Sequence, residues 1–139
     1  MLSYVYFGTN DLERAVHFYE AVLAPLDMRR CITGDPEWDC VAVGWGTYED
    51  AGVRELAFWI GKPFNQQPAT AGNGSMVAFG ARSWRAVDEF YEAALAHGGS
   101  SDGAPGLRLH YAADFYAAYV RDPDGNKLAA VCRGIAKRD

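Results

Sequence analysis

The sequence lacks the features that define several broad classes of protein. No apolar run approaches the length of about 20 residues that a membrane-spanning helix needs, and Lys and Arg do not cluster as they do on a nucleic-acid-binding face. The net charge of −5 slightly disfavours highly anionic ligands, although local fields can override it. We therefore expect neither a membrane nor a nucleic acid as a partner.

Cysteines are few and show no pairing pattern. Cys31, Cys40 and Cys132 are odd in number, lack CxxC spacing and lie in apolar surroundings. We expect them to be reduced thiols that pack inside a cytoplasmic protein. The first residues enter a strand-like pattern at once, without the charged start, apolar run and cleavage site of a signal peptide. The sequence thus predicts a single cytoplasmic domain over residues 1–139.

What the sequence does contain is an internal repeat. Residues 18–24 read FYEAVLA and recur at 90–96 as FYEAALA. The same offset pairs Val5 with Val77, Phe7 with Phe79, Leu56 with Leu128 and Ala57 with Ala129. We expect two copies of one module, at about residues 1–61 and 75–133, joined by a linker at 62–74 that is rich in Pro, Gln, Asn and Gly.

Each half is predicted to run strand, helix, strand, strand, strand. The first helix is expected to open at Asn10, with Glu13 completing a capping box, and to end at Pro25. The second opens at Ser83. The predicted strands cover residues 4–8, 28–32, 41–45 and 55–60 in the first half and 76–80, 107–111, 115–121 and 127–132 in the second. This order predicts an α+β fold in which two curved mixed sheets enclose a cleft, a common place for a ligand.

Three short segments resemble one known superfamily. They are residues 10–15 (NDLERA) leading to Phe18 and Tyr19, then Ala78 with Phe79, and finally residues 122–128 (DPDGNKL). The chain resembles the vicinal-oxygen-chelate superfamily, which includes glyoxalase I, bleomycin-resistance proteins and extradiol dioxygenases. The resemblance spans nearly the whole chain and implies that family's fold of two βαβββ modules. It also implies a homodimer, since many members pair and some exchange halves between chains.

The resemblance further implies a divalent metal, held by His from the first strands and Glu from the last strands of the two halves. The corresponding positions here are Tyr4, Ala57, Met76 and Ala129. Alanine has no donor atom and a thioether is too soft for zinc, nickel or iron(II). A phenol, with a pKa of about 10, is a poor lone ligand at neutral pH. We therefore expect no cofactor and no metal at the usual place.

Strand alternation predicts the walls of a ligand site. Tyr4 and Tyr6 face the cleft if the residues between them pack under the helix, and Met76 and Trp59 follow by the same rule. With small residues between them, these side chains would suit a flat apolar or aromatic ligand. The alternative is that the large side chains simply fill the cleft as part of the core.

Two polar residues are candidate anchors for a ligand. Alternation on the predicted strand 107–111 places Arg108 and His110 on one face. If that face is the cleft, the pair can fix a carboxylate, phenolate or carbonyl group; if not, both are ordinary solvated residues. Residues 122–125 (DPDG) predict a tight turn rather than a pair of catalytic carboxylates.

The sequence therefore favours a metal-independent binding protein for a small apolar or aromatic molecule. The predicted ligand-binding residues are Tyr4, Tyr6, Trp59, Met76, Arg108 and His110. The alternative is a glyoxalase- or dioxygenase-like enzyme, a lyase or oxidoreductase, with displaced metal ligands or with His110 as a metal-free acid or base.

Overall fold

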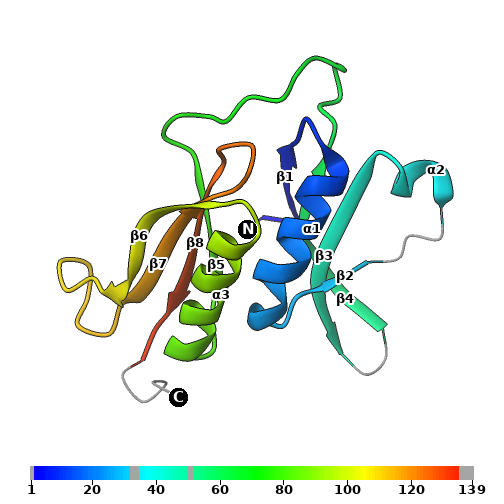
Figure 1. Ribbon diagram of the computed structural model, residues 1–139. Coiled ribbons are helices and arrows are strands. Elements are labelled where there is room, and N and C mark those ends of the chain that lie inside the picture. The colour runs from blue at the N-terminus through cyan, green and yellow to red at the C-terminus, as the bar shows by residue number, and fades with distance from the viewer. Residues whose placement is uncertain (1, 32–34, 50–51, 135–139) are drawn as a thin grey trace.

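The computed structural model describes residues 2–31, 35–49 and 52–134, and the side chains at 39, 48–49 and 52–57 stay outside the description. The first half contains β1 (Val5–Gly8), α1 (Leu12–Leu23), the short turn η1 (Ala24–Leu26), β2 (Arg29–Arg30), α2 (Pro36–Asp39), β3 (Ala42–Glu49) and β4 (Gly52–Gly61). The second contains β5 (Met76–Gly80), α3 (Trp84–Ala96), β6 (Ser100–Leu107), β7 (Tyr116–Arg121) and β8 (Lys127–Cys132). Apart from the added α2 and η1, both halves have the predicted order (Figure 1).

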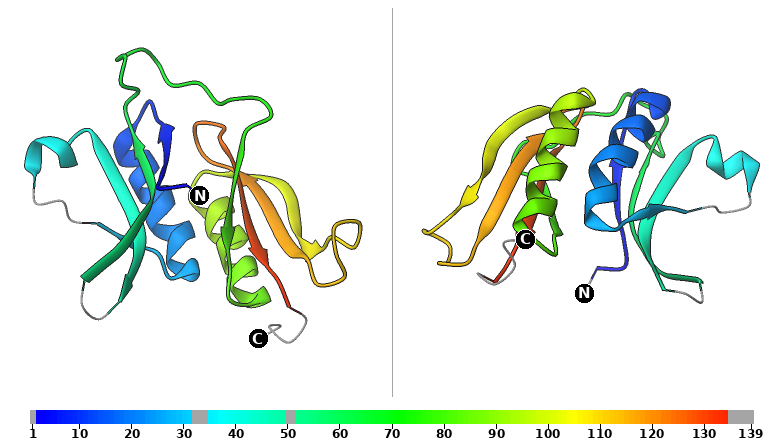
Figure 2. Two further views of the ribbon diagram at one scale, coloured as in Figure 1. Left: turned by 180° about the vertical axis from the view of Figure 1, so that it is seen from behind. Right: turned by 60° about the horizontal axis from the view of Figure 1, so that its bottom comes forward.

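Each half forms its own four-stranded sheet. The strand orders are β1-β4-β3-β2 and β5-β8-β7-β6, which are the same arrangement twice. In each sheet the first and last strands of the module pair in parallel and the other pairs are antiparallel. The α+β class and the two mixed sheets are thus confirmed. The two sheets do not close around a common cleft in the described part of the chain; they diverge from the paired helices (Figure 2).

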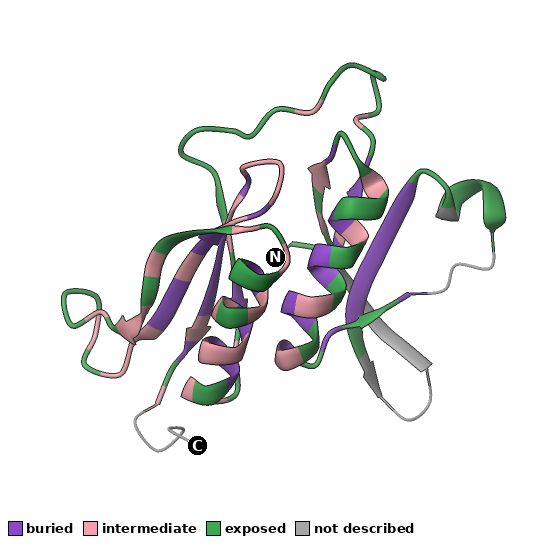
Figure 3. Ribbon diagram, in the orientation of Figure 1, coloured by how far each residue is buried: buried purple, intermediate pink, exposed green. Residues whose placement is uncertain are grey.

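The core lies between the two sheets and includes both helices. Helices α1 and α3 pack side by side, and buried residues of both halves form one cluster (Figure 3). Phe58 of β4 meets Phe79 of β5 edge to face, with ring centroids 5.4 Å apart. Each sheet therefore turns one face inward. We call the opposite, solvent-facing sides the first outer face (β1-β4-β3-β2) and the second outer face (β5-β8-β7-β6).

Helix α1 begins one residue later than predicted. Asp11 is the N-cap, and its carboxylate accepts from the backbone N–H of Arg14 at 3.0 Å, so the expected capping box of Asn10 and Glu13 is wrong. The Asn10 side chain instead forms two hydrogen bonds with the linker. It donates to the Ala69 carbonyl at 3.0 Å and accepts from the Ala69 N–H at 2.7 Å. The prediction for α3 holds, since Ser83 caps it.

The register of the repeat slips by two residues before the last strand. Val5 pairs with Phe58 in the first half, whereas Val77 pairs with Leu128 in the second. Phe58 is therefore the equivalent of Leu128, and the expected match of Ala57 with Ala129 is wrong. The segments between helix and last strand differ in length, and a shift of two keeps side chains on the same face because they alternate with period two.

Two predicted strands are misplaced. Strand β6 ends at Leu107 and residues 108–114 form turns, in which the N–H groups of Tyr111 and Ala112 both donate to the Arg108 carbonyl. The strand expected at 107–111 is therefore wrong. Strand propensity does not predict β6, because its sequence is rich in Gly and Pro; its pairing with β7 shifts register at two points. Of the strand expected at 28–32, only Arg29–Arg30 pairs as β2, and residues 32–34 lie outside the described part.

Two predictions from composition concern the cysteines and membrane-spanning helices. Cys31 and Cys132 are buried, as predicted, whereas Cys40 is exposed because it follows the short surface helix α2. No helix among the described residues combines the length and the apolar character needed to cross a membrane.

Candidate functional site

The first outer face begins with two tyrosines of the β1 edge. Val5 and Phe7 pack against the core, while Tyr4 and Tyr6 remain 63% and 40% exposed on the opposite side. The Tyr6 hydroxyl donates to the Lys62 carbonyl at 2.7 Å, so its polar end is held by the linker. Partial burial raises the pKa of Tyr6, which keeps the phenol neutral. The alternation predicted from the sequence therefore places both rings away from the core.

Trp59 lies next to Tyr6 on the same face. The two residues are paired across β1 and β4, and Gly44 of β3 pairs with Trp59 from the other side. A Cβ atom on Gly44 would come within 2.8 Å of the Trp59 ring, so the indole lies directly over this glycine. Trp38 of α2 meets Trp59 at 73°, with centroids 6.3 Å apart. The missing side chain of Gly44 therefore lets the indole lie flat on the sheet.

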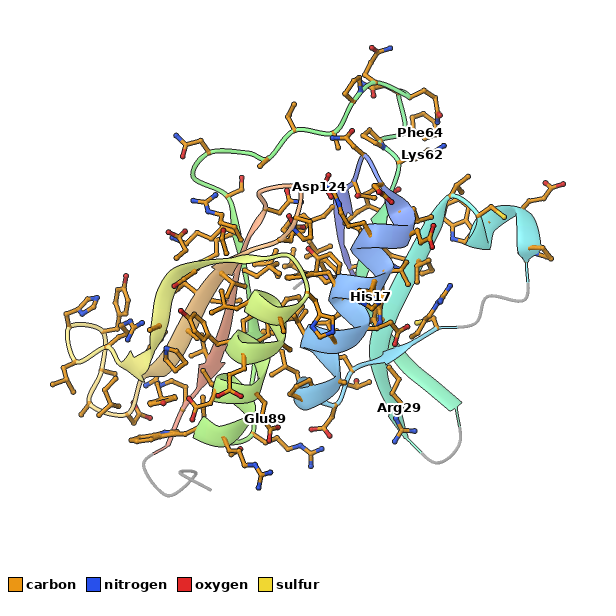
Figure 4. The ribbon with its side chains drawn as sticks, viewed as in Figure 1. His17, Arg29, Lys62, Phe64, Glu89 and Asp124 are labelled. Carbon is orange, nitrogen blue, oxygen red and sulfur yellow. The ribbon has the colours of Figure 1, made fainter. Side chains whose placement is uncertain are left out.

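A hollow of about 700 Å³ opens on the first outer face. Its apolar walls come from Tyr4, Tyr6, Trp38, Val41 and Phe64. All five side chains are exposed, and Phe64 is fully so. The linker closes one side of the hollow, with Lys62 and Phe64 beside the end of β1 (Figure 4). Polar residues also line the hollow, and they are Lys62, Asn65, Gln66 and Thr70. A concave surface that combines apolar walls with some polar groups is typical of small-molecule sites.

The second outer face has a hollow of its own, of about 640 Å³. Met76, 46% exposed, lines it together with Tyr111, Phe115 and Tyr119. Three cations also line it, and they are Arg121, Lys127 and Arg133. The predicted residue Met76 is therefore separated from Tyr4 and Tyr6, which line the hollow of the other sheet.

Arg108 and His110 do not form the expected pair. They lie in the turns after β6, where the alternation of a strand does not apply. The Arg108 guanidinium donates to the Ala104 carbonyl at 2.6 Å and lies 5.4 Å from the Tyr119 ring centroid. The exposed His110 rests against the Tyr111 ring, with centroids 4.1 Å apart. Both residues thus belong to the surroundings of the second hollow.

A smaller hollow of about 200 Å³ links the two outer faces beneath the linker. Tyr6 lines it from the first face, Lys127 from the second, and Ser75 from the end of the linker. The two larger hollows share no lining residue with each other. The small hollow shares lining residues with both, and among the hollows described no other one does.

Sequence reasoning missed most of the second hollow. Lys127 and Arg133 were not singled out, although alternation along β8 places Lys127, Ala129 and Val131 on the outer face. Tyr119 and Arg121 follow by pairing with Ala129 and Lys127. The signal was available in the alternation of two strands that were themselves predicted correctly. Trp38 and Phe64 carried no comparable signal, because they lie on α2 and in the linker.

Residues 122–125 form the predicted turn, which also joins the two halves. Asp122 is 4% exposed and accepts from the Tyr19 hydroxyl at 2.5 Å and from the Asn126 amide at 2.9 Å. Asp124 accepts from the Thr9 hydroxyl at 2.6 Å and from the Arg14 guanidinium at 3.1 Å. These carboxylates of the second half therefore bind α1 and its entry in the first half.

Because of this network, the free energy of unfolding is expected to fall at alkaline pH. Burial and the neighbouring Asp122 carboxylate raise the pKa of Tyr19 well above its ordinary value of about 10. Below that value the phenol is neutral in both states; above it only the unfolded chain releases the proton, so stability falls as pH rises. We expect urea unfolding between about pH 9 and pH 11 to show a shallower loss of stability in Tyr19→Phe than in the parent chain. Equal slopes would contradict the raised pKa.

The family-type metal positions do not fit a divalent metal. Tyr4 directly precedes β1 and Met76 is the first residue of β5, so the two line separate hollows, and Ala129 has no donor atom. Ala57 lies outside the described side chains, and its place in register is taken by Trp59. Among described residues there is no group of three or more His, Cys, Asp or Glu that could hold a metal ion. The donor set thus differs from the His and Glu ligands typical of the family.

Comparison with known proteins identifies the family. The profile of the glyoxalase/bleomycin resistance protein/dioxygenase superfamily matches residues 2–130. A glyoxalase/bleomycin resistance protein from Albidiferax ferrireducens T118 is 38% identical, with a TM-score of 0.77 over 96% of this chain and 99% of that one. The chain belongs to this vicinal-oxygen-chelate superfamily, as its motifs predicted. No protein of curated function matches the sequence.

More distant structures share the fold alone. Protein SA1046 from S. aureus is 19% identical, with a TM-score of 0.67 over 95% of this chain and 94% of that one. The fosfomycin resistance protein FosX from Listeria monocytogenes is 17% identical, with a TM-score of 0.62 over 100% and 98%. Proteins with different names thus share this fold, and the function of this chain must be argued from its site.

Proposed function

We propose that this chain is a metal-independent binding protein for a small apolar or aromatic molecule, held on the first outer face. The observation that carries the proposal is the hollow of about 700 Å³ with exposed aromatic walls. Exposed Tyr and Trp rings offer large contact areas at low cost in side-chain entropy. Removing about 150 Å² of a bicyclic ring from water contributes about 4 kcal/mol. Part of this gain offsets the entropy lost on association, so we expect a dissociation constant of about 1 mM or weaker.

Tryptophan fluorescence can test this site directly. Trp38 lines the hollow and Trp59 lies against Trp38 without lining it, whereas Trp45 is buried in the core and Trp84 stacks on Tyr116 of the second sheet. We expect naphthol, titrated into the millimolar range, to quench the emission saturably, and EDTA to leave the titration unchanged. Trp59→Ala should abolish saturation, because it removes the ring that supports Trp38.

The control is Leu95→Ala, which removes an exposed apolar side chain from α3, lines neither hollow and should leave naphthol binding unchanged. Circular dichroism of both variants confirms that they fold. Loss of binding in EDTA would contradict the proposal that binding is independent of metal. Unchanged saturation in Trp59→Ala would contradict the location of the site on the first outer face.

We further propose that the chain works as a homodimer in which the second outer face of one copy covers the first outer face of the other. Within one chain, Tyr4 and Tyr6 are separated from Met76, Arg108 and His110, so a site using all of them needs two copies. Exposed apolar side chains on both faces support this arrangement. A stable interface buries about 1,200–2,000 Å², which a pair of sheet faces can supply.

Sedimentation velocity tests the dimer. We expect the parent chain to sediment as a dimer, and Tyr4→Glu or Phe64→Glu to shift it to monomer, because each places a charge on the covered face. Leu95→Glu, on the exposed side of α3, is the control that should stay dimeric. A monomeric parent chain, or a dimer that tolerates both charged variants, would contradict the proposal.

A further inference from the structure

The second outer face gathers cations on a chain that is acidic as a whole. The net charge is −5, yet Arg121, Lys127 and Arg133 line a single hollow, and no Asp or Glu belongs to its described lining. Arg121 and Lys127 both contact one carboxylate, that of Asp102, at 3.0 and 3.1 Å. Two cations thus share one negative charge, and the hollow keeps a positive excess.

A second carboxylate pairs with Arg133 at the rim, so the three lining cations face two carboxylates. Its guanidinium donates to Asp114 at 2.8 Å, and half of the Arg133 side chain remains exposed. Lys127 and Arg121 hold the pKa of Asp102 below its ordinary range, and Arg133 does the same for Asp114. Both shifts follow from the ion pairs that these two carboxylates make.

Aromatic rings lie beside these cations. The Tyr119 ring has the Lys127 ammonium 5.5 Å from its centroid and the Arg108 guanidinium 5.4 Å from it. The Arg133 guanidinium lies 5.4 Å from the Phe115 centroid. Cations held against rings in this way are positioned before any ligand arrives. The hollow therefore combines flat apolar walls with fixed positive charge.

We infer that this second hollow binds a small planar organic anion, such as an aromatic carboxylate, between Tyr119 and Phe115 with its charge toward Lys127 and Arg133. The volume of about 640 Å³ lies within the range of small-ligand sites. Guanidinium and ammonium groups are the usual partners of carboxylate and phosphate. The inference does not rest on the proposed binding of an apolar molecule, because within one chain the second hollow shares no lining residue with the first.

Fluorine NMR with a matched pair of probes tests the site. Para-fluorobenzoate carries the charge, and para-fluorobenzyl alcohol is its neutral counterpart of similar size. We expect the benzoate to bind saturably and about tenfold more tightly than the alcohol, since hydrogen bonds to charged groups are the stronger ones. Because no tryptophan lines the second hollow, this titration reads a different site from naphthol quenching.

Variants then test which side chains bind the carboxylate of the benzoate. Lys127→Met and Arg133→Gln should each weaken benzoate binding by about tenfold, whereas Arg85→Gln, on the exposed side of α3, should change nothing. Equal binding of the two probes, or full binding in Lys127→Met and Arg133→Gln, would overturn the inference. Displacement of benzoate by an equal concentration of inorganic phosphate would overturn the claim that the site prefers a planar ligand, because the site would then recognise charge alone.

Discussion

Replacing Asp122 with alanine is expected to lower the free energy of unfolding by about 3–5 kcal/mol. The buried carboxylate accepts from the Tyr19 hydroxyl, from the Asn126 side-chain amide and from the backbone N–H groups of Asp124 and Asn126. Its removal leaves these buried donors without a partner, at about 1–3 kcal/mol for each donor that water cannot reach. The expected loss is a large share of the 5–15 kcal/mol that stabilises an ordinary domain.

Urea unfolding followed by circular dichroism measures this loss, with two comparison variants. Tyr19→Phe keeps the ring and removes one donor, so we expect a smaller loss of about 1–2 kcal/mol. Glu89→Gln breaks an exposed pair within α3 and should leave the midpoint unchanged. If Asp122→Ala unfolds at the same urea concentration as Glu89→Gln, the buried network does not hold the two halves together.

The second large effect is expected from Gly99→Ala, which should lower stability by at least about 2 kcal/mol through overpacking. A Cβ atom at this position would lie 2.7 Å from the Arg121 carbonyl oxygen and from a Phe18 ring carbon, and 2.8 Å from the Ala94 carbonyl oxygen. Two of these atoms belong to backbone that is fixed in β7 and α3. The chain must therefore shift where α3 meets the second sheet.

Gly80→Ala is the matched control for this prediction. A Cβ atom at Gly80 meets nothing within 4 Å, so the same substitution adds a side chain to open space at the end of β5. We expect its stability to be unchanged or raised by about 0.5 kcal/mol, because alanine restricts the unfolded chain. Equal thermal midpoints for Gly99→Ala and Gly80→Ala would contradict the close approach at Gly99.

Local sequence patterns were sufficient for most of the architecture. The repeat defined two modules, and the strands at 76–80 and 127–132 were predicted to the residue. Alternation correctly turned Tyr4, Tyr6 and Met76 away from the core. These features depend on neighbours within a few positions, where side-chain period and turn residues dominate. The same logic failed at 107–111, because a Gly- and Pro-rich strand has no apolar pattern to read.

The candidate site was only partly predictable. Trp59 lies beside Tyr6 as alternation required, but its flat position depends on Gly44, which comes from another strand. Lys127 and Arg121 share Asp102 only because β6, β7 and β8 meet in one register. A two-residue slip between the halves also makes Trp59, rather than Ala57, the equivalent of Ala129. Such relations join positions that are distant in sequence, and no local pattern encodes them.

The sequence by itself determined the family, the two βαβββ modules and the faces of β1 and β5, because repeats and period-two alternation are local properties of the chain. Only the tertiary structure decided how those modules are placed. The helices pack together at the centre, so the sheets turn their outer faces apart and divide the expected site into an aromatic and a cationic hollow. The site is divided because the inner faces of both sheets are buried in one core. This burial depends on contacts between the two halves, which local patterns within each half do not specify.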